Sequence, residues 1–345
     1  MRVVVADPPA YTPQYDHELA AALVRGAADV ELVTSHFRFA SAPAPAGYRR
    51  RQLFYPLSAR LFGRSRLRLP LKAIEHPLGL ARLAAVRADV LHVQWLAVPE
   101  VDVRLLRHRA PLVLTAHDLL PRRTAHRHRL WHRLFHRFER VVVHSEHGRR
   151  TLAAFGVPSE RLRVIPHPVF RSDPDRCDDG RTVLALGVIR PYKQLDHAAE
   201  AVRAAGARLL VAGDRAAPLP ELTGAELRLG YLSQTELERA LGDATVAVFP
   251  YRPELDQSGA LLQALGAGVP AVTYDVAGLA EPVARYGAGR VVPADDVGAL
   301  ADSIRELLED PAALEEARAG ARRARDALTW DASARAHLEL YRELA

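Results

Sequence analysis

Short apolar segments alternate with helical patterns along the whole chain of 345 residues, and this alternation restricts the fold more than any other feature. It is typical of parallel sheets whose strands are joined by crossover helices. The apolar segments are continuous runs of valine, leucine and isoleucine, which indicates strands buried on both faces. The expected strands are residues 2–6, 30–34, 90–94, 112–115, 140–144 and 162–165, followed by 182–186, 208–212, 226–230, 246–250, 271–274 and 289–292.

The length predicts two domains, because a typical domain has about 100–150 residues. Prolines and a run of aspartates interrupt the pattern over residues 166–180, and we place a linker there. The expected organisation is an N-terminal domain over residues 1–168, a C-terminal domain over 169–327 and a final helix within 328–345 that packs back on the first domain. Residues 40–70 have no clear periodicity and are expected to form an irregular, mobile surface segment.

Positive charge is concentrated in the first half of the chain. Residues 1–170 contain 27 arginines and lysines against 13 acidic residues, whereas residues 171–345 contain 20 against 28. The split favours an anionic partner for the first half, and charge alone does not choose among phospholipid, nucleic acid and a phosphorylated acceptor. The apolar, arginine-rich region from Phe54 to Leu69 indicates either a peripheral contact with an anionic membrane or simply an arginine-rich surface.

Cysteine usage and hydropathy indicate a cytoplasmic protein. Cys177 is the only cysteine, so an intramolecular disulfide is impossible and a cysteine-based zinc site is not expected. The first apolar run is too short for a signal peptide, and no stretch reaches the roughly 18 apolar residues of a membrane helix. A membrane contact would therefore be made from the inner face, without spanning the bilayer.

Two cations follow the expected strand 182–186 at the entry to a helix. They are Arg190 and Lys193, and Lys193 is one of only two lysines in the chain. A helix N-terminus offers unpaired N–H groups and partial positive charge, so two full charges beside it favour a phosphate site. Two solvated cations on a loop are the alternative.

A second helix begins at Ser258 and Gly259, directly after the strand 246–250. Glycine lets an anion approach the backbone amides, and Ser258 could both cap the helix and bond a phosphate oxygen. Gln263 lies about one turn further, where a ribose would sit. Because open α/β sheets bind ligands at the C-terminal ends of their strands, two such sites on one sheet favour a bound nucleotide over two ordinary capped helices.

These motifs resemble the retaining nucleotide-sugar glycosyltransferases of family four. The resemblance covers nearly the whole chain and implies the GT-B fold, an α/β architecture in which two Rossmann-like, doubly wound parallel-sheet domains face each other across a cleft. It also implies transfer of a sugar from a nucleotide-diphosphate donor to an acceptor hydroxyl on a glycan, a lipid-linked molecule or a small molecule. The segments that carry it are residues 187–196, 210–214, 229–232, 256–272 and 278–281, with 91–95, 114–118, 143–146 and 164–168 in the first half.

The resemblance assigns the donor-binding residues. Arg190 and Lys193 match the pair that binds the donor diphosphate, and Gln263 stands where the family usually has a ribose-binding glutamate. The family's sugar-binding glutamate falls on a leucine here, between Glu254 and Asp256, and we favour Asp256 for that role. The remaining expected donor contacts are Gly187, Tyr231, Leu232, Gln257, Ser258 and Gly259.

The first half is expected to hold the acceptor and one catalytic histidine. His117 matches the histidine that the family places beside the donor sugar, and a structural histidine bonded to a carbonyl is the alternative. Asp118 either orients its ring or caps the next helix. The expected acceptor contacts are Tyr11, Tyr15 and Asp118, with Gln14 as a further candidate. The first strand ends in Asp7 and two prolines where similar enzymes have a glycine-rich turn, and proline has no N–H to offer an anion.

The implied mechanism depends on charge stabilisation. Arg190, Lys193 and the helix amides would stabilise the leaving diphosphate, whose oxygen takes the acceptor proton, so that configuration at the sugar carbon is retained. No Asp-x-Asp arrangement at a strand end demands a divalent ion, and we expect neither a metal nor another cofactor. The alternatives are a nucleotide-sugar epimerase or phosphorylase of the same architecture and a basic nucleic-acid-binding protein, whose usual recognition motifs are absent.

One histidine-rich segment suggests a metal site at first sight. His128, His132 and His136 fall on one stripe of the expected helix 127–138. Aromatic and leucine side chains form the other face of that helix, so we interpret the histidines as the solvated side of an ordinary crossover helix.

Overall fold

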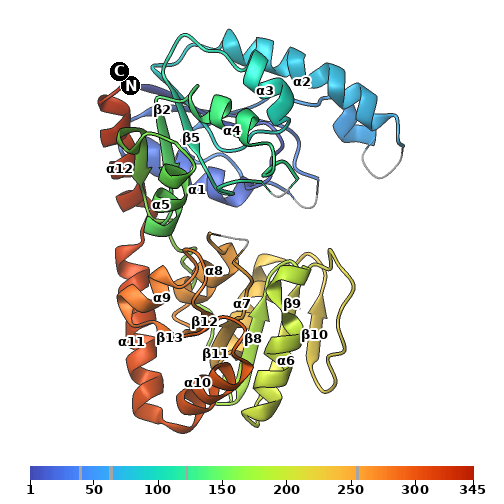
Figure 1. Cartoon of the computed structure of the whole chain (residues 1–345), viewed down its shortest axis with the longest axis vertical. Helices are drawn as coiled ribbons and strands as arrows, with labels where there is room; N and C mark the ends of the chain where they lie inside the picture. The colour runs from blue at the N-terminus through green and yellow to red at the C-terminus, as the bar shows by residue number, and fades with distance from the viewer. Residues whose placement is uncertain (39–40, 62–64, 122, 254–255) are drawn as a thin grey trace. The chain divides into compact units, whose positions relative to one another are not determined.

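The computed structural model describes residues 1–38, 41–61, 65–121, 123–253 and 256–345. The chain forms two compact units. The N-terminal unit comprises Met1–Pro166 together with Trp330–Ala345, and the C-terminal unit comprises His167–Thr329. Each unit is built on one parallel sheet covered by helices (Figure 1), which confirms the expected α/β class.

The N-terminal unit contains a seven-stranded sheet in the order β3-β2-β1-β4-β5-β6-β7. The strand order reverses beside β1, which pairs in parallel with both β2 and β4. The strands are β1 (Arg2–Asp7), β2 (Asp29–Thr34), β3 (Arg49–Gln52), β4 (Val90–Val93), β5 (Leu112–Thr115), β6 (Arg140–Val143) and β7 (Leu162–Val164). The helices are α1 (Pro13–Arg25), α2 (Arg68–Ala84), α3 (Pro99–Leu105), α4 (His128–Phe135), α5 (Glu146–Ala154) and α12 (Trp330–Arg342), with short 3-10 turns at Ser58–Leu61 and Ser159–Arg161.

The final helix α12, red in Figure 1, packs on α1 within the N-terminal unit. The two helices approach closely, because a Cβ added to Gly26 at the end of α1 would lie 2.5 Å from Leu338 Cδ1. At the start of α12, the ring of Trp330 meets the edge of Tyr15, with centroids 5.0 Å apart. Arg25 and Asp331 form an exposed ion pair of 2.6 Å beside this contact.

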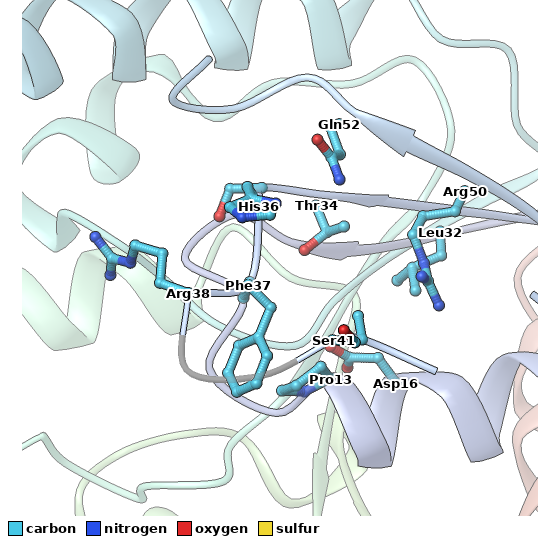
Figure 2. Close-up of a pocket in the computed structure, with 13 residues that line it drawn as sticks. Pro13, Asp16, Leu32, Thr34, His36, Phe37, Arg38, Ser41, Arg50 and Gln52 are labelled. Carbon is cyan, nitrogen blue, oxygen red and sulfur yellow. The ribbon is translucent and has the colours of Figure 1, made fainter. Parts of the chain in front are cut away.

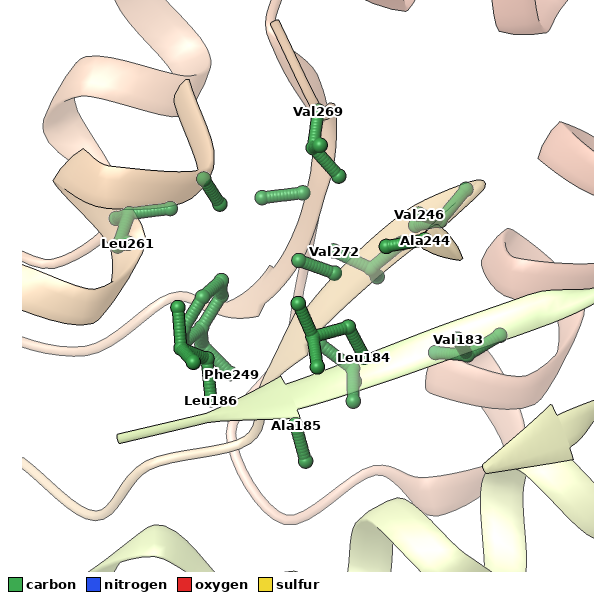
Figure 3. Packing of buried hydrophobic residues seen from close by; sticks show 14 of the residues in the cluster. Val183, Leu184, Ala185, Leu186, Ala244, Val246, Phe249, Leu261, Val269 and Val272 are labelled. Atoms are coloured by element: carbon green, nitrogen blue, oxygen red, sulfur yellow. The ribbon is translucent and has the colours of Figure 1, made fainter. Parts of the chain in front are cut away.

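The C-terminal unit contains a six-stranded sheet in the order β10-β9-β8-β11-β12-β13. Figure 3 shows its core, in which Val183, Leu184 and Leu186 of β8 pack with Val246 and Phe249. The strands are β8 (Thr182–Leu186), β9 (Arg208–Gly213), β10 (Glu226–Leu229), β11 (Val246–Phe249), β12 (Ala271–Tyr274) and β13 (Gly289–Val292). The helices are α6 (Leu195–Ala204), α7 (Gln234–Asp243), α8 (Gly259–Gly266), α9 (Glu281–Tyr286), α10 (Val297–Glu309) and α11 (Pro311–Ala327), with a 3-10 turn at Pro191–Lys193.

The expectation of an irregular segment over residues 40–70 is wrong for Arg49–Gln52, which form the edge strand β3. This strand has no apolar residue, so hydrophobic patterning does not reveal it. Its backbone pairs with β2 from Glu31↔Arg49 to Thr34↔Gln52. The buried carboxylate of Glu31 forms ion pairs with Arg51 and with Arg2 of β1, and these charges stabilise the edge across three strands.

Candidate functional site

A buried ammonium group lies at the C-terminal end of β8. Lys193 is only 5% exposed, and its Nζ turns back to donate to the carbonyl of Leu186 at 2.7 Å. Nζ also lies 5.1 Å from the centroid of the Tyr251 ring, a cation–π distance. Burial, with a smaller contribution from the charge of Arg190, lowers the pKa of Lys193 to about 7. No carboxylate of the described residues forms an ion pair with it, and a buried cation without a counter-ion favours an anionic ligand.

Gly187 separates the strand from this cation. Its φ of +96° lies in the left-handed region, which glycine adopts without steric cost. A Cβ added there would lie 2.8 Å from Lys193 Nζ and 3.1 Å from Ala260 Cβ. The ammonium and the first turn of α8 therefore both lie against Gly187, so that the two expected phosphate-binding features share one place.

The N-terminus of α8 is capped and open at its tip. The side chain of Ser258 accepts a hydrogen bond of 3.4 Å from the N–H of Leu261, which confirms its expected capping role. Gly259 is exposed, and a Cβ added to it would meet only Phe170, at 4.0 Å. Ligand oxygens can thus reach the amides of the first turn, where the helix dipole is positive.

The other expected donor contacts differ in exposure and in hydrogen bonding. Gln257 donates to the carbonyl of Gly278 at 2.9 Å, and Asp256 is 5% exposed just before the cap. Arg190 is exposed at the end of the loop that follows β8. Glu254 lies outside the described residues. Tyr231 is 56% exposed after β10, whereas Leu232 and, within α8, Gln263 are half-buried, and the roles of all these residues stay predictions.

Sequence reasoning missed Tyr251. Its ring is 3% exposed and lies edge-on to that of Tyr192, with centroids 5.6 Å apart. Together with the Leu186 carbonyl, it holds the lysine side chain from the side of β11. The sequence does place Tyr251 two residues after the buried strand β11. In the sheet, β11 lies beside β8, the strand that precedes Lys193.

In the N-terminal unit, His117 follows β5 and is held among side chains. Its Nε2 lies 2.9 Å from Oε1 of Gln94, which accepts a hydrogen bond from the ring. The ring stacks on Trp95, with centroids 5.0 Å apart and an angle of 14°, and meets the edge of Tyr15 at 4.7 Å. The indole N–H of Trp95 in turn donates to Oγ1 of Thr12 at 2.8 Å. These contacts fix the orientation of the imidazole ring.

The expected acceptor residues differ in exposure. Tyr11 is 55% exposed with its edge on Trp95, whereas Tyr15 is 2% exposed and lies in the aromatic cluster around His117. Asp118 is half-buried after β5. The capping alternative for Asp118 is wrong, because the next helix α4 has Arg127 at its N-cap. The acceptor roles of the three residues stay predictions.

Helix α4 has the two faces that the sequence indicates. Trp131, Leu134 and Phe135 are buried, and the rings of His132 and His136 lie 4.4 Å apart on the other side. Among the described residues, no three histidine, cysteine or acidic side chains are grouped as a metal would need. No helix in the described ranges is long and apolar enough to cross a bilayer.

Family models match both halves of the chain. The model "Glycosyltransferase Family 4" matches residues 14–172, and "Glycosyl transferases group 1" matches residues 180–310. With the two parallel sheets, these matches define the class: the chain belongs to the glycosyltransferases of the GT-B fold. Within that class, an N-terminal domain of the family 4 type is followed by a C-terminal domain of the group 1 type, which confirms the expected glycosyltransferase family and the GT-B fold. The retaining mechanism stays a prediction.

Solved structures with the same fold extend over the whole chain. Sucrose-phosphate synthase from Thermosynechococcus elongatus is 20% identical with a TM-score of 0.79, and the comparison covers 100% of this chain and 99% of that one. HepE from Anabaena, solved in complex with UDP and glucose, is 16% identical with a TM-score of 0.68 over 100% of both chains. At these identities the likeness establishes the fold alone.

Curated relatives match only part of the chain. An exopolysaccharide phosphotransferase of Streptomyces coelicolor is 31% identical over 191 residues, which are 50% of this chain and 20% of that protein. A glycogen synthase of Mycobacterium tuberculosis is 37% identical over 114 residues, which are 33% of this chain and 27% of that protein. The chain thus spans about a fifth to a quarter of the curated relatives it matches.

Proposed function

We propose that the chain transfers a sugar from a nucleotide-diphosphate donor to an acceptor hydroxyl with retention of configuration. One observation carries this proposal: Lys193 Nζ and the first turn of α8 lie together against Gly187 at the C-terminal edge of the sheet. An ammonium has three N–H donors, and Leu186 takes one of them. The other two, with the amides at the tip of α8, suit the oxygens of a diphosphate.

The same groups would assist the chemical step. As the bond between the sugar and the diphosphate breaks, negative charge grows on the leaving oxygens, and a preorganised ammonium and helix dipole stabilise it. We assign Arg190 to the same charge, Asp256 or Glu254 to the sugar hydroxyls, Gln263 to the ribose, and Tyr231 with Leu232 to the base. His117 would contact the transferred sugar. In the retaining mechanism, a diphosphate oxygen accepts the proton of the attacking hydroxyl, and neither a metal nor another cofactor takes part.

Titration with donors tests the proposal. Because HepE was solved with UDP-glucose, UDP-sugars come first, followed by GDP-, ADP- and dTDP-sugars. A true donor at a hundred times its dissociation constant should stabilise the chain by about 2.7 kcal/mol. Transfer should persist in EDTA, and NMR of the product should show the donor's anomeric configuration. An isomerised nucleotide sugar formed from donor alone would instead indicate an epimerase, and a sugar phosphate formed only after inorganic phosphate is added would indicate a phosphorylase. Binding to none of the donors would refute the proposal.

A second proposal concerns the partner of helix α2, which we assign to an anionic membrane surface. The outer side chains Leu67, Ile74 and Leu78 are 70%, 62% and 52% exposed at helical spacing, and Leu69 beside them is 61% exposed. The flanking cations are Arg66, Arg68 and Arg82. Exposed apolar side chains between cations match the interface of an anionic bilayer. The enzyme would then work at the inner face of the cytoplasmic membrane.

The opposite side of α2 is firmly anchored, so the exposed stripe is a fixed feature of the surface. The carboxylate of Glu75 accepts hydrogen bonds from the N–H groups of Leu57 and Ser58 at 2.7 and 3.0 Å. His76 is buried, with Asp102 at 2.7 Å from one ring nitrogen and the Tyr55 hydroxyl at 2.7 Å from the other.

Sedimentation with vesicles tests the membrane proposal. Vesicles with an anionic lipid should bind the protein, and the double variant Leu67→Ser with Ile74→Ser should bind at least tenfold less. Leu105→Ser removes a leucine that is 46% exposed on α3, outside the stripe, and serves as the control. Equal binding of both variants would count against this surface.

A further inference from the structure

Two buried ionisable groups at strand ends are held in place by different means. Asp16 lies beside a pocket of about 500 Å³ in the N-terminal unit, where Figure 2 shows it on α1, and its carboxyl is hydrogen-bonded to that of Asp7. The ammonium of Lys193 in the C-terminal unit donates to a backbone carbonyl, that of Leu186. Its position therefore depends on the course of the short turn that carries it.

The turn Pro191–Lys193 is followed by a residue in an unusual backbone conformation. Gln194 has a φ of +44° and a ψ of +55°, in the left-handed region that a residue with a Cβ adopts at a steric cost. Its N–H closes the 3-10 turn on the carbonyl of Pro191 at 3.2 Å, and its own carbonyl accepts from the N–H of Ala198 in α6 at 3.1 Å. The left-handed residue thus separates the turn from the helix. With a right-handed residue, the turn would run on into α6 and Lys193 would point elsewhere.

The side chain of Gln194 holds this conformation. The residue is 5% exposed, and its Nε2 donates to Oδ1 of Asp295 at 2.8 Å. Asp295 follows β13, lies 101 residues further along the chain and itself has a left-handed φ of +61°. One hydrogen bond to a carboxylate, the stronger kind, thus joins two left-handed residues of separate loops. Unfavourable backbone conformations persist where the surroundings fix them, and they indicate a functional arrangement.

The loop that follows β11 supports the same turn from another direction. The N–H of Arg252 donates to the carbonyl of Tyr192 at 2.9 Å, and the ring of Tyr192 meets that of Tyr251 edge-on. This support acts on the middle of the turn. The bond to Asp295 acts on the left-handed residue itself, and so on the direction in which the Lys193 side chain leaves the backbone.

We propose that Gln194, held by Asp295, is a positioning residue that keeps the Lys193 ammonium in place for the donor diphosphate. The proposal rests on the proposed transferase function for its ligand, whereas the placement of the ammonium can be measured without any ligand. Glycine would adopt the same φ at no steric cost but would lose the bond to Asp295. Substitution by glycine therefore removes the anchor while leaving the backbone conformation accessible.

The ammonium can be observed directly, because Lys72 and Lys193 are the only lysines of the chain. NMR of the full chain with isotope-labelled lysine should give one side-chain signal for each, and Lys72→Arg assigns them. Burial, and next the charge of Arg190, lower the pKa of Lys193 to about 7, so its signal should titrate near neutral pH. Tyr251 is the ionisable group that faces it from the loop after β11.

Loss of the anchor should change this titration. In Gln194→Gly and in Asp295→Gly, we expect the pKa of Lys193 to rise by about one unit or more, because a loosened turn lets Nζ reach water, which favours the charged form. Loss of the negative charge of Asp295 would by itself act in the opposite direction. Asp295→Asn is the conservative control: its amide oxygen still accepts from Gln194, asparagine tolerates a left-handed φ, and the titration should match that of wild type.

Donor binding gives the second readout. We expect UDP-glucose, or the nucleotide sugar that wild type binds best, to bind Gln194→Gly and Asp295→Gly about fivefold less tightly, and the double variant no more weakly than either, because all three lack the same bond. Asp295→Asn should bind like wild type. Circular dichroism checks that each variant is folded.

The outcomes separate the two proposals. A pKa of Lys193 that is unchanged in both glycine variants would overturn the positioning role, and so would losses of affinity that add up in the double variant. If the glycine variants shift the titration but wild type binds no nucleotide sugar, the placement of Lys193 by Gln194 is upheld and the proposed transferase function is refuted.

Discussion

The strands β1 and β8 hold equivalent positions in the two sheets and end in opposite chemistry. In the N-terminal sheet, β1 lies between β2 and β4. In the C-terminal sheet, β8 lies in the same way between β9 and β11. Where β1 ends, the chain buries the carboxyl of its last residue, Asp7, beside that of Asp16. After β8, it passes through Gly187 and buries the ammonium of Lys193.

This difference means that one topology offers different chemistry at its two strand ends. A turn with two prolines offers few N–H groups, and a protonated acid pair is suited to neutral hydroxyls. A turn with a left-handed glycine leaves room for a cation and for the amides of a neighbouring helix, which suit phosphate. The sign of the buried group, more than the fold, distinguishes the two sites.

The largest expected effect is that of Lys193→Ala. Removal of one preorganised donor to a developing anion lowers turnover by about 100-fold or more, and we expect that loss in kcat/KM for the donor. Lys72→Ala is the control, because it removes the only other lysine, which lies over the Tyr55 ring at 4.6 Å in the N-terminal unit. Steady-state kinetics with circular dichroism as a check of folding would decide, and donor turnover within threefold of wild type in Lys193→Ala would reject the phosphate role.

Gly187→Ala should have the next largest effect. The new Cβ would meet Lys193 Nζ at 2.8 Å and displace it, so we expect donor affinity to fall about tenfold, together with a loss of about 1–3 kcal/mol from backbone strain. Gly206→Ala isolates the strain, because Gly206 also has a positive φ, +67°, and a Cβ there meets nothing within 4 Å. Isothermal titration with UDP should separate the variants. Equal affinities would mean that the ammonium does not touch the ligand.

The strands were predictable because buried runs of branched apolar residues have few other uses. The sequence also indicated that Lys193 and the start of α8 follow neighbouring strands, and the structure brings the two together at Gly187. Their role in binding phosphate stays a prediction. The edge strand Arg49–Gln52 was not predictable, since its stability comes from backbone pairing and from charges on Glu31 and Arg2. Contacts between distant residues were equally hidden. No local pattern brings Tyr251 to Lys193.

The acid pair was hidden for a related reason. The sequence indicated a proline turn after the first strand and a helix beginning close behind it. Which side of the helix faces the strand is decided by packing against α12 and β2, and this rotation alone turns Asp16 toward Asp7. Hydrophobic periodicity located the helix but gave no reason to expect a carboxylate on its buried side.

A smaller effect is expected from pH on donor binding. Because the pKa of Lys193 is lowered to about 7 in the free protein, the ammonium is increasingly neutral above that pH. A bound diphosphate favours the charged form, so binding must take up a proton, and affinity should fall by up to about tenfold for each pH unit above 7.

UDP-glucose is the suitable ligand, since its diphosphate charge is constant in this range. Titrations in buffers of different ionisation enthalpy measure the proton uptake, which should vanish in Lys193→Ala; an affinity independent of pH from 7 to 9 would contradict the assignment.

The smallest expected effect is on stability, at the other strand end. Burial raises the pKa of Asp7 and Asp16, so above about pH 4 the folded chain holds more protons than the unfolded chain. The free energy of unfolding must then fall as pH rises, by up to about 1.4 kcal/mol per pH unit for each extra proton. Asp16→Asn removes the titrating group. The free energy of unfolding of this variant, minus that of wild type, should increase by about 1 kcal/mol between pH 5 and pH 8 in urea denaturation. The exposed control Asp29→Asn, on β2 in the same unit, should stay parallel to wild type over this range. A constant difference between Asp16→Asn and wild type from pH 5 to pH 8 would contradict the raised pKa of Asp16 in the folded chain.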